Sequence, residues 1–488
     1  MNRVKVSSLA VAAVWSMGAL VAASATAQVP VPPATPAPLE PLPAVEPLPA
    51  VEPLPALQPA ALQPAVPPPA TTQPALSKFK LTFYGFLELD AMYDSTQSFG
   101  EAVGATLVAR DKTYAAENSR LQFSARNSRF GVRINAPQLG EIKTSGVLEM
   151  DFFGVQAPGI SSASTVSNGT FRLRQAVVRV ETPIVDVLFG QTYHLFGWQP
   201  FFFPMAVSYF PIMNQVFGRQ PQLRISKTIK SEALNVDLAV SASKPPQVNS
   251  GVPDIQGGVK FGFNGWKGLH TPSASGLLHD PLTIGVSGVV RKFRVAEFAA
   301  SPADTNSATG YGLAASALIP VIPAASLDDA GNSLTLVGTF FSGTGIADLL
   351  GVPQNVPYPA LPANMDGTVP AFTPDIDPGL VTYDARGELQ TINWTGFTVG
   401  LQYYLPPSGK VQLALNYTQG EAGQLTADNG WAMYRTFSRK GRYIDANLFF
   451  DVTAAVRLGL AYQNNQHTYP DGEEATNHRG MAAFYLNF

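Results

Sequence analysis

The stretch KLTFYGFLELDAMYD, residues 80–94, decides the fold. Apolar side chains occupy most of its odd positions, whereas Glu88, Asp90 and Asp94 stand at even positions. Successive side chains of a strand point to opposite faces. The alternation therefore predicts a strand with one apolar and one largely charged face. A soluble sandwich would give the same alternation on shorter strands, but this strand is long enough to cross a bilayer at a tilt.

The same alternation recurs along the rest of the chain in about sixteen segments. Short connections such as 137–140, 182–184 and 452–453 alternate with long ones such as 95–119, 192–219, 343–388 and 465–477, which is typical of transmembrane barrels. Two connections, 265–280 and 321–332, are longer than expected, because the alternation would make both of them short. An even number of strands places both ends of the barrel on the periplasmic side. The expected strands are 80–94, 120–136, 141–153, 170–181, 185–191, 220–229, 232–243, 255–264, 281–294, 308–320, 333–342, 389–405, 410–420, 441–451, 454–464 and 478–488.

The composition agrees with a membrane barrel and excludes several other classes of protein. Only 14% of the 488 residues are charged, against about 25% in soluble domains. The chain has no cysteine, which excludes disulfides and thiolate metal sites. Its 32 basic and 35 acidic residues leave a net charge of −3, so no nucleic-acid partner is expected.

The first 77 residues are of a different kind from the barrel. Residues 1–27 have the basic start, the apolar stretch and the Ala25-Thr26-Ala27 end of a cleaved signal peptide, although a membrane anchor is the alternative. Residues 28–77 are rich in proline and repeat Glu-Pro-Leu-Pro-Ala, which predicts an extended, disordered periplasmic spacer. The spacer could also bind the cell wall or a periplasmic partner. The barrel domain is expected to be residues 78–488.

Arginines recur at positions that should face the lumen. In the expected strand 120–136, apolar residues stand at odd positions before residue 126 and at even positions after residue 129. The apolar face therefore changes side, which predicts a bulge between these positions. The functional interpretation is a basic ladder that concentrates anions, and the alternative is that these arginines merely neutralise lumenal carboxylates. The ladder would consist of Arg120, Arg126, Arg129, Arg133, Arg172 and Arg174, and the carboxylates are those of Glu88, Asp90, Glu149 and Asp151.

The loop 192–219 follows the fifth expected strand and contains no Asp or Glu. We expect it to fold into the lumen as the third loop and to form the constriction. Its aromatic residues could guide apolar parts of a solute or could fasten the loop to the barrel wall. The candidate constriction residues are His194, Trp198, Asn214, Gln215 and Arg219.

Several of these stretches resemble porins. Asn127-Ser-Arg-Phe-Gly-Val-Arg-Ile, followed by Pro137-Gln-Leu-Gly, is similar to two adjacent strands of the 16-stranded trimeric porins of the bacterial outer membrane. Residues 146–154 (GVLEMDFFG), Arg172-Leu-Arg174 and Phe189-Gly-Gln-Thr-Tyr193 resemble the DcaP-like branch more closely. The proline-rich segment departs from that branch, whose members carry an N-terminal coiled coil.

The resemblance implies an all-β, closed antiparallel barrel of about 16 strands in the outer membrane. It also implies a homotrimer in contact with outer-membrane lipid, and passive diffusion of small anionic solutes such as dicarboxylates. The terminal Phe488 implies recognition by the outer-membrane assembly machinery. No cofactor, metal site or catalytic residue is expected, since the sequence carries no HExxH or Gly-x-Ser-x-Gly motif. A non-selective diffusion pore, a structural tether and a barrel enzyme remain as alternatives.

Overall fold

The computed structural model describes residues 78–102, 107–154, 169–208, 211–247, 249–266, 282–326, 329–351, 359, 361, 374–384, 386–426 and 437–488. The predicted signal peptide, 1–27, and spacer, 28–77, lie outside these residues and stay predictions.

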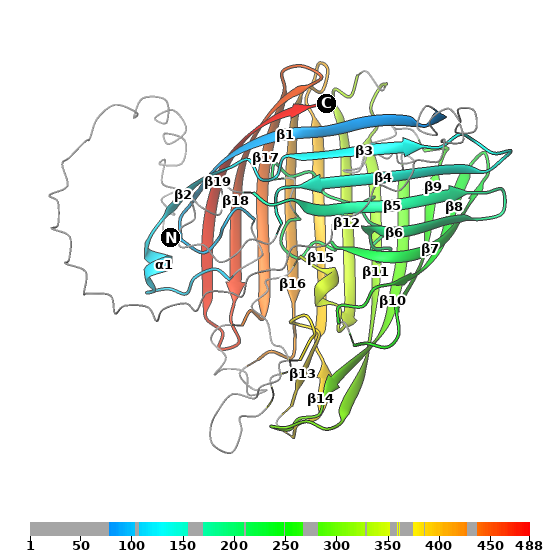
Figure 1. The fold of residues 1–488 in the computed structure, drawn as a ribbon. Coiled ribbons are helices and arrows are strands. Elements are labelled where there is room, and N and C mark those ends of the chain that lie inside the picture. Colours follow the sequence, from blue (N-terminus) through cyan, green and yellow to red (C-terminus); the bar gives the residue numbers. More distant parts are fainter. Residues whose placement is uncertain are drawn as a thin grey trace, which may run out of the picture. The chain divides into compact units, whose positions relative to one another are not determined.

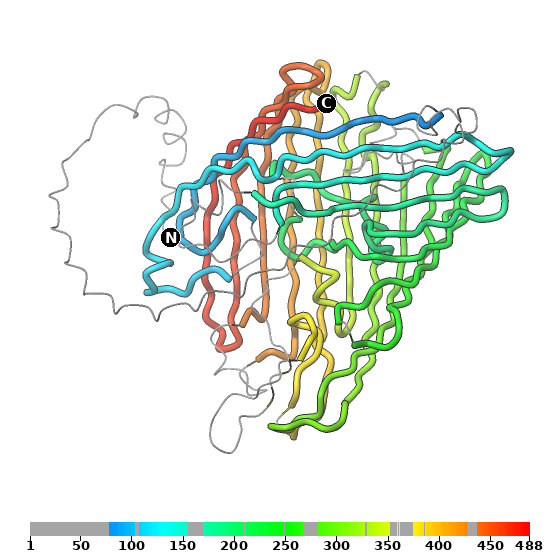
Figure 2. Tube along the Cα trace, viewed as in Figure 1, coloured from blue at the N-terminus to red at the C-terminus, as the bar shows by residue number. Residues whose placement is uncertain are grey.

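The strands form one closed antiparallel sheet (Figure 1). The first strand, β1, pairs with the last strand, β19, on one side and with both β2 and β3 on the other. In Figure 2 the blue start of the barrel therefore runs beside its red end. Since β2 and β3 follow one another along β1, they are two parts of one strand, and the described part of the chain closes as a 16-stranded barrel. The predicted all-β barrel is confirmed.

The elements have the following bounds. The first half of the barrel consists of β1 (Lys80–Asp94), β2 (Arg120–Ser124), β3 (Arg129–Asn135), β4 (Lys143–Asp151), β5 (Arg172–Glu181), β6 (Asp186–Tyr193), β7 (Arg219–Lys230), β8 (Leu234–Ser243) and β9 (Asp254–Phe263). The second half consists of β10 (Leu282–Ala296), β11 (Thr305–Ile322), β12 (Ser333–Thr344), β15 (Asn393–Tyr404), β16 (Val411–Glu421), β17 (Lys440–Asp451), β18 (Val456–Thr468) and β19 (Glu474–Asn487). The loops hold α1 (Tyr114–Glu117), η2 (Ala347–Leu349) and the hairpin of β13 (Val381–Tyr383) and β14 (Leu389–Thr391).

The structure corrects two expected strand ends. The expected strand 389–405 divides, because β14 leaves the barrel to pair with β13. The expected long connection 465–477 shrinks to 469–473, because β18 continues to Thr468 and β19 begins at Glu474. Near these ends both faces of the hairpin carry polar residues, so no hydrophobic alternation marks the strands. The expected connection 265–280 lies largely outside the described residues.

The barrel is apolar outside and polar inside. The exposed large apolar side chains alternate along the strands with buried polar ones; on β1, Leu87 and Leu89 are exposed while Glu88 and Asp90 are buried. An apolar exterior of this extent suits lipid rather than water. Among the described residues, no helix has the length and hydropathy needed to cross a membrane. Because their outward faces are apolar, the barrel strands are the membrane-spanning segments.

We predict that replacing the outward-facing Leu415 on β16 with arginine destabilises the barrel by about 2–4 kcal/mol, because it places a charge in the hydrocarbon near mid-strand. Leu415→Ala is the matched control and should cost much less. Urea unfolding in phospholipid vesicles measures both. Equal stability of the two variants would show that this face does not contact lipid.

Candidate functional site

The connection between β6 and β7, residues 194–218, folds into the lumen and is called the third loop here. It is first tied to β9 and β10. The backbone N–H groups of Leu195 and Phe196 both donate to Gln256 Oε1 at 2.9 Å. The Gly197 N–H donates to Ser287 Oγ at 2.7 Å, and Trp198 Nε1 donates to the Val286 carbonyl at 3.0 Å. The inward fold of this loop, predicted from the sequence, is confirmed.

The middle of the third loop reaches the opposite wall. Asn416 Nδ2 on β16 donates to the Met205 carbonyl at 2.8 Å, and the Val207 N–H donates to Asn447 Oδ1 on β17 at 2.9 Å. Asn127, in the break between β2 and β3, donates to the Ser208 carbonyl at 3.1 Å. The third loop therefore spans the lumen from β9 and β10 to the walls around β1, β16 and β17.

The predicted constriction residues His194, Trp198, Asn214 and Gln215 are all buried. Asn214 Nδ2 donates to the Gly441 carbonyl on β17 at 3.0 Å, and Gln215 Oε1 accepts from the Ile212 N–H at 3.0 Å. Burial lowers the pKa of His194 to about 3, so its imidazole is neutral at physiological pH. Trp198 and Asn214 thus fasten the loop to the wall, whereas the side-chain hydrogen-bond partners of His194 and Gln215 lie within the loop itself.

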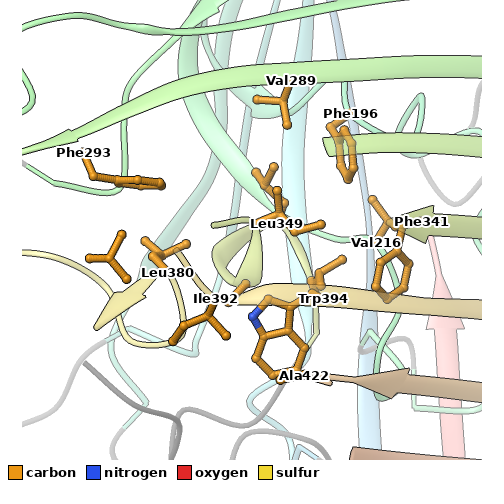
Figure 3. Close-up of a cluster of buried hydrophobic side chains, with 14 of the residues drawn as sticks. Phe196, Val216, Val289, Phe293, Phe341, Leu349, Leu380, Ile392, Trp394 and Ala422 are labelled. Carbon is orange, nitrogen blue, oxygen red and sulfur yellow. The ribbon is translucent and has the colours of Figure 1, made fainter. Parts of the chain in front are cut away.

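A second loop, between β12 and β15, also packs inward, which was not predicted from the sequence. Figure 3 shows Phe196 and Val216 of the third loop in one apolar cluster with Leu349, Leu380 and Ile392 of the β12–β15 loop. The cluster rests on apolar wall residues of β10, β12 and β15, namely Val289, Phe293, Phe341 and Trp394. The two loops together therefore fill the side of the lumen next to these strands.

An ion-pair network fixes the β12–β15 loop at the same place. Arg291 on β10 is fully buried and pairs with Asp254 on β9 and with Asp348 in η2, both at 2.5 Å. Removing one partner of such a buried pair leaves an uncompensated charge, which is strongly destabilising. Arg291 thus holds η2 against β9 and β10, the wall to which the start of the third loop is also bonded.

Four of the predicted ladder arginines have polar partners within the protein. Arg126 pairs with Glu101 at 2.7 Å, and Arg120 Nη1 donates to the Phe99 carbonyl at 2.9 Å. The other two of these four, Arg172 and Arg174, have the predicted lumenal carboxylates as partners. Arg172 pairs with Asp151 at 2.5 Å, and Arg174 pairs with Glu149 at 2.7 Å and Asp151 at 2.8 Å. Neutralisation of acids therefore accounts for part of the ladder.

Other arginines of this wall lie against aromatic rings. Arg129 lies over Phe86 at 5.0 Å, and Arg133 lies over Tyr84 at 4.1 Å. Arg219 lies over both Tyr193 and Phe217, at 5.6 and 5.4 Å from the ring centroids. Arg129 Nε and Arg219 Nη1 are buried atoms without a hydrogen-bond partner.

Arg224 on β7 belongs to the same wall, although it was not among the predicted lumenal arginines. Its Nη2 donates to the Tyr193 carbonyl at 2.8 Å. The signal was present, because its exposed neighbours Leu223 and Ile225 point outward and leave Arg224 facing the lumen. The predicted ladder drew only on expected strands that carry two or more arginines, and the expected strand 220–229 carries one.

The arginines of β3, β5 and β7 form one basic wall. Arg174 Nη2 donates to Tyr193 Oη at 3.1 Å, and Arg219 lies over the ring of the same tyrosine. Arg129 and Arg172 are both register partners of Asp151 on β4, so these four arginines share one stretch of the wall. Two carboxylates, those of Glu149 and Asp151, lie among them, and the third loop opposite contributes none. The basic wall consists of Arg129, Arg133, Arg172, Arg174, Arg219 and Arg224.

No known protein-family profile and no curated protein matches the sequence. Among solved structures, the outer-membrane channel DcaP of Acinetobacter baumannii is 18% identical with a TM-score of 0.59, and the match covers 84% of this chain and 98% of that chain. The chain has the porin fold. An anion-selective porin from Comamonas acidovorans (12% identity, TM-score 0.47, 84% of this chain and all of that one) also matches. The trimer form of OmpT from Vibrio cholerae also matches, with 10% identity and a TM-score of 0.44, over 84% of this chain and 99% of that chain. The predicted porin fold is thereby confirmed.

The attachment of the third loop can be tested at Gln256. We predict that Gln256→Leu loosens the loop, because two buried N–H groups lose their acceptor at a cost of roughly 1–3 kcal/mol each. Single-channel recordings should then show larger fluctuations of the open current. Gln402→Leu on β15, another buried lumenal glutamine, is the matched control. An unchanged current in the Gln256 variant would contradict the role of this contact.

Proposed function

We propose that the chain is an outer-membrane porin through which small hydrophilic anions, including organic carboxylates, diffuse passively. The observation that carries this proposal is the basic wall of β3, β5 and β7, where six arginines outnumber two carboxylates and no acid lies in the facing loop. The porin fold and the apolar exterior support the location in the outer membrane.

The arrangement of the loops makes the basic wall important for permeation. The third loop and the β12–β15 loop cover the lumenal face of β10, β12 and β15. In contrast, Arg129, Arg133, Arg172, Arg219 and Arg224 are only partly buried. Solutes would pass along these arginines, whose field is strengthened in a narrow passage with walls of low dielectric constant.

The wall would favour carboxylates over simple halide ions. A guanidinium group offers two parallel N–H donors to a carboxylate. A solute with two carboxylates could contact two arginines at once, so dicarboxylates are the substrates that this proposal favours.

We predict that the wild-type pore prefers anions and that Arg129→Gln with Arg219→Gln shifts the reversal potential in a salt gradient toward cations. Among the described residues neither arginine forms an ion pair with an acid, so the change removes two lumenal charges without breaking an ion pair, although Arg129 does lie near the buried Glu88 and Glu149. Arg457→Gln, at the rim of the barrel and paired with Asp451, removes one charge elsewhere and should leave selectivity unchanged.

Cation preference in the wild type, or no shift in the double variant, would contradict the proposed selectivity. The first result would leave a pore of the opposite preference. The second would leave a general diffusion pore, which is the alternative function that the sequence kept open. Absence of any conductance in planar bilayers would contradict a channel altogether and favour a tether or an enzyme.

We further propose a homotrimer whose contacts involve the outer face of β1 to β6. The most exposed outward aromatic rings gather there: Phe83 is 73% exposed, Phe189 69% and Phe171 63%. The Phe171 ring also contacts that of Phe130 edge-to-face and that of Phe152 at a tilt, with centroid distances of 5.8 and 5.1 Å. The terminal Phe488, which is 59% exposed, is the corresponding candidate for recognition by the assembly machinery.

Mass photometry of the detergent-purified protein should give the mass of three chains. Phe171→Ala with Phe189→Ala should shift the population toward single barrels, because it removes apolar contact area. Phe340→Ala with Phe450→Ala, outward rings of β12 and β17, is the control and should remain trimeric. A wild-type protein with the mass of one chain would contradict the trimer.

A further inference from the structure

Four side chains with oxygen atoms lie where the third loop contacts the wall around β1. Glu88 and Asp90 lie on β1, Asn127 lies in the break between β2 and β3, and Ser208 lies in the third loop. Their exposed fractions are only 2%, 1%, 1% and 4%. The basic wall described above does not use this group.

Contacts link the four residues in a chain from Asp90 through Glu88 and Asn127 to Ser208. Asn127 Nδ2 donates to Glu88 Oε2 at 2.7 Å and to the Ser208 carbonyl at 3.1 Å. The carboxyl group of Glu88 is within hydrogen-bonding reach of that of Asp90. Two adjacent lumenal residues of one strand, the broken strand beside it and the third loop therefore converge on one point.

Each of the four side chains has an oxygen without a hydrogen-bond partner. These atoms are Glu88 Oε1, Asp90 Oδ1, Asn127 Oδ1 and Ser208 Oγ. Most buried polar atoms in proteins are hydrogen-bonded, so such a group requires an explanation. The Asn127 amide is informative, because its nitrogen is used by Glu88 while its oxygen, on the same small group, is unused.

The negative charge of the group is incompletely balanced by the protein. The nearest cationic groups are Arg129, which lies over Phe86, and Arg479, which pairs with Asp94 at 2.8 Å. Glu101 adds a further negative charge near Asp90. Two neighbouring buried carboxylates need a cation or a proton between them.

A proton and a metal ion make different demands on these atoms. A proton shared by Glu88 and Asp90 would satisfy carboxylate oxygens and would leave Asn127 Oδ1 and Ser208 Oγ unused. A hard divalent cation accepts carboxylate, amide and hydroxyl oxygens together, and Ca²⁺ takes six to eight such ligands, often including water. A cation accounts for all four oxygens at once and also balances the charge of the two carboxylates, whereas a shared proton accounts for the carboxylates alone.

We propose that Glu88, Asp90, Asn127 and Ser208 bind a divalent cation of the Ca²⁺ type, which fastens the third loop to β1. Ser208 belongs to the loop and Glu88 to the wall, so the ion would join two segments 120 positions apart in the chain. The site would set the position of the loop independently of which solutes the pore admits.

The test uses the full barrel, refolded in detergent without lipopolysaccharide, which itself binds divalent ions. Ca²⁺ should raise the thermal unfolding midpoint of the wild type by several degrees, and a chelator should reverse this. Glu88→Gln with Asp90→Asn should abolish the response to Ca²⁺. Glu181→Gln with Asp186→Asn, which removes the same two kinds of charge at the β5–β6 turn, should retain it.

Ca²⁺ binding measured by calorimetry keeps the proposal testable if the double variant fails to fold. Ser208→Ala removes one neutral ligand and should weaken Ca²⁺ binding by roughly tenfold. Two results would overturn the proposal: a wild-type midpoint that responds to pH but not to Ca²⁺, as a shared proton requires, or Ca²⁺ binding that survives in Glu88→Gln with Asp90→Asn.

Discussion

Every backbone N–H and C=O group at membrane depth needs a partner within the chain, because hydrocarbon offers none. The pairing of β1 with β19 meets this requirement for the first and last strands. It extends to the chain end, where the Gly85 N–H donates to the Phe488 carbonyl at 2.9 Å and the Phe488 N–H donates to the Gly85 carbonyl at 3.0 Å. Closure forces the polar face of each strand inward and creates a lumen that only loops can fill.

The loops fill that lumen unevenly, and the proposed function rests on this asymmetry. Apolar contacts such as Val216 with Leu350 hold the third loop and the β12–β15 loop together on one side. Arg291 locks η2 to the same wall. The opposite wall keeps partly accessible arginines over aromatic rings. A protein with a net charge of only −3 can thus present a strongly basic passage, because position rather than total charge sets the local field.

The sequence predicted those features that depend on local periodicity. The bounds of β1 were predicted as residues 80–94 because polar and apolar residues alternate throughout. The break between Ser124 and Arg129 was predicted from the change of phase. Features that depend on tertiary neighbours were not predictable in this way. The partner of Arg172 is set by the register of β4 against β5, and the contact of Ile392 with the third-loop cluster is set by the path of a long loop.

The central claim is that permeation follows the basic wall and avoids the side that the loops cover. Because the chain has no cysteine, single cysteines can report access directly. Ser226 lies on the lumenal face of β7 and is partly exposed, whereas Ser316 on β11 is buried against Thr339. The decisive measurement is the block of channel current by a negatively charged thiol reagent on Ser226→Cys and Ser316→Cys. We expect block for Ser226→Cys and none for Ser316→Cys, and the reverse pattern would contradict the account.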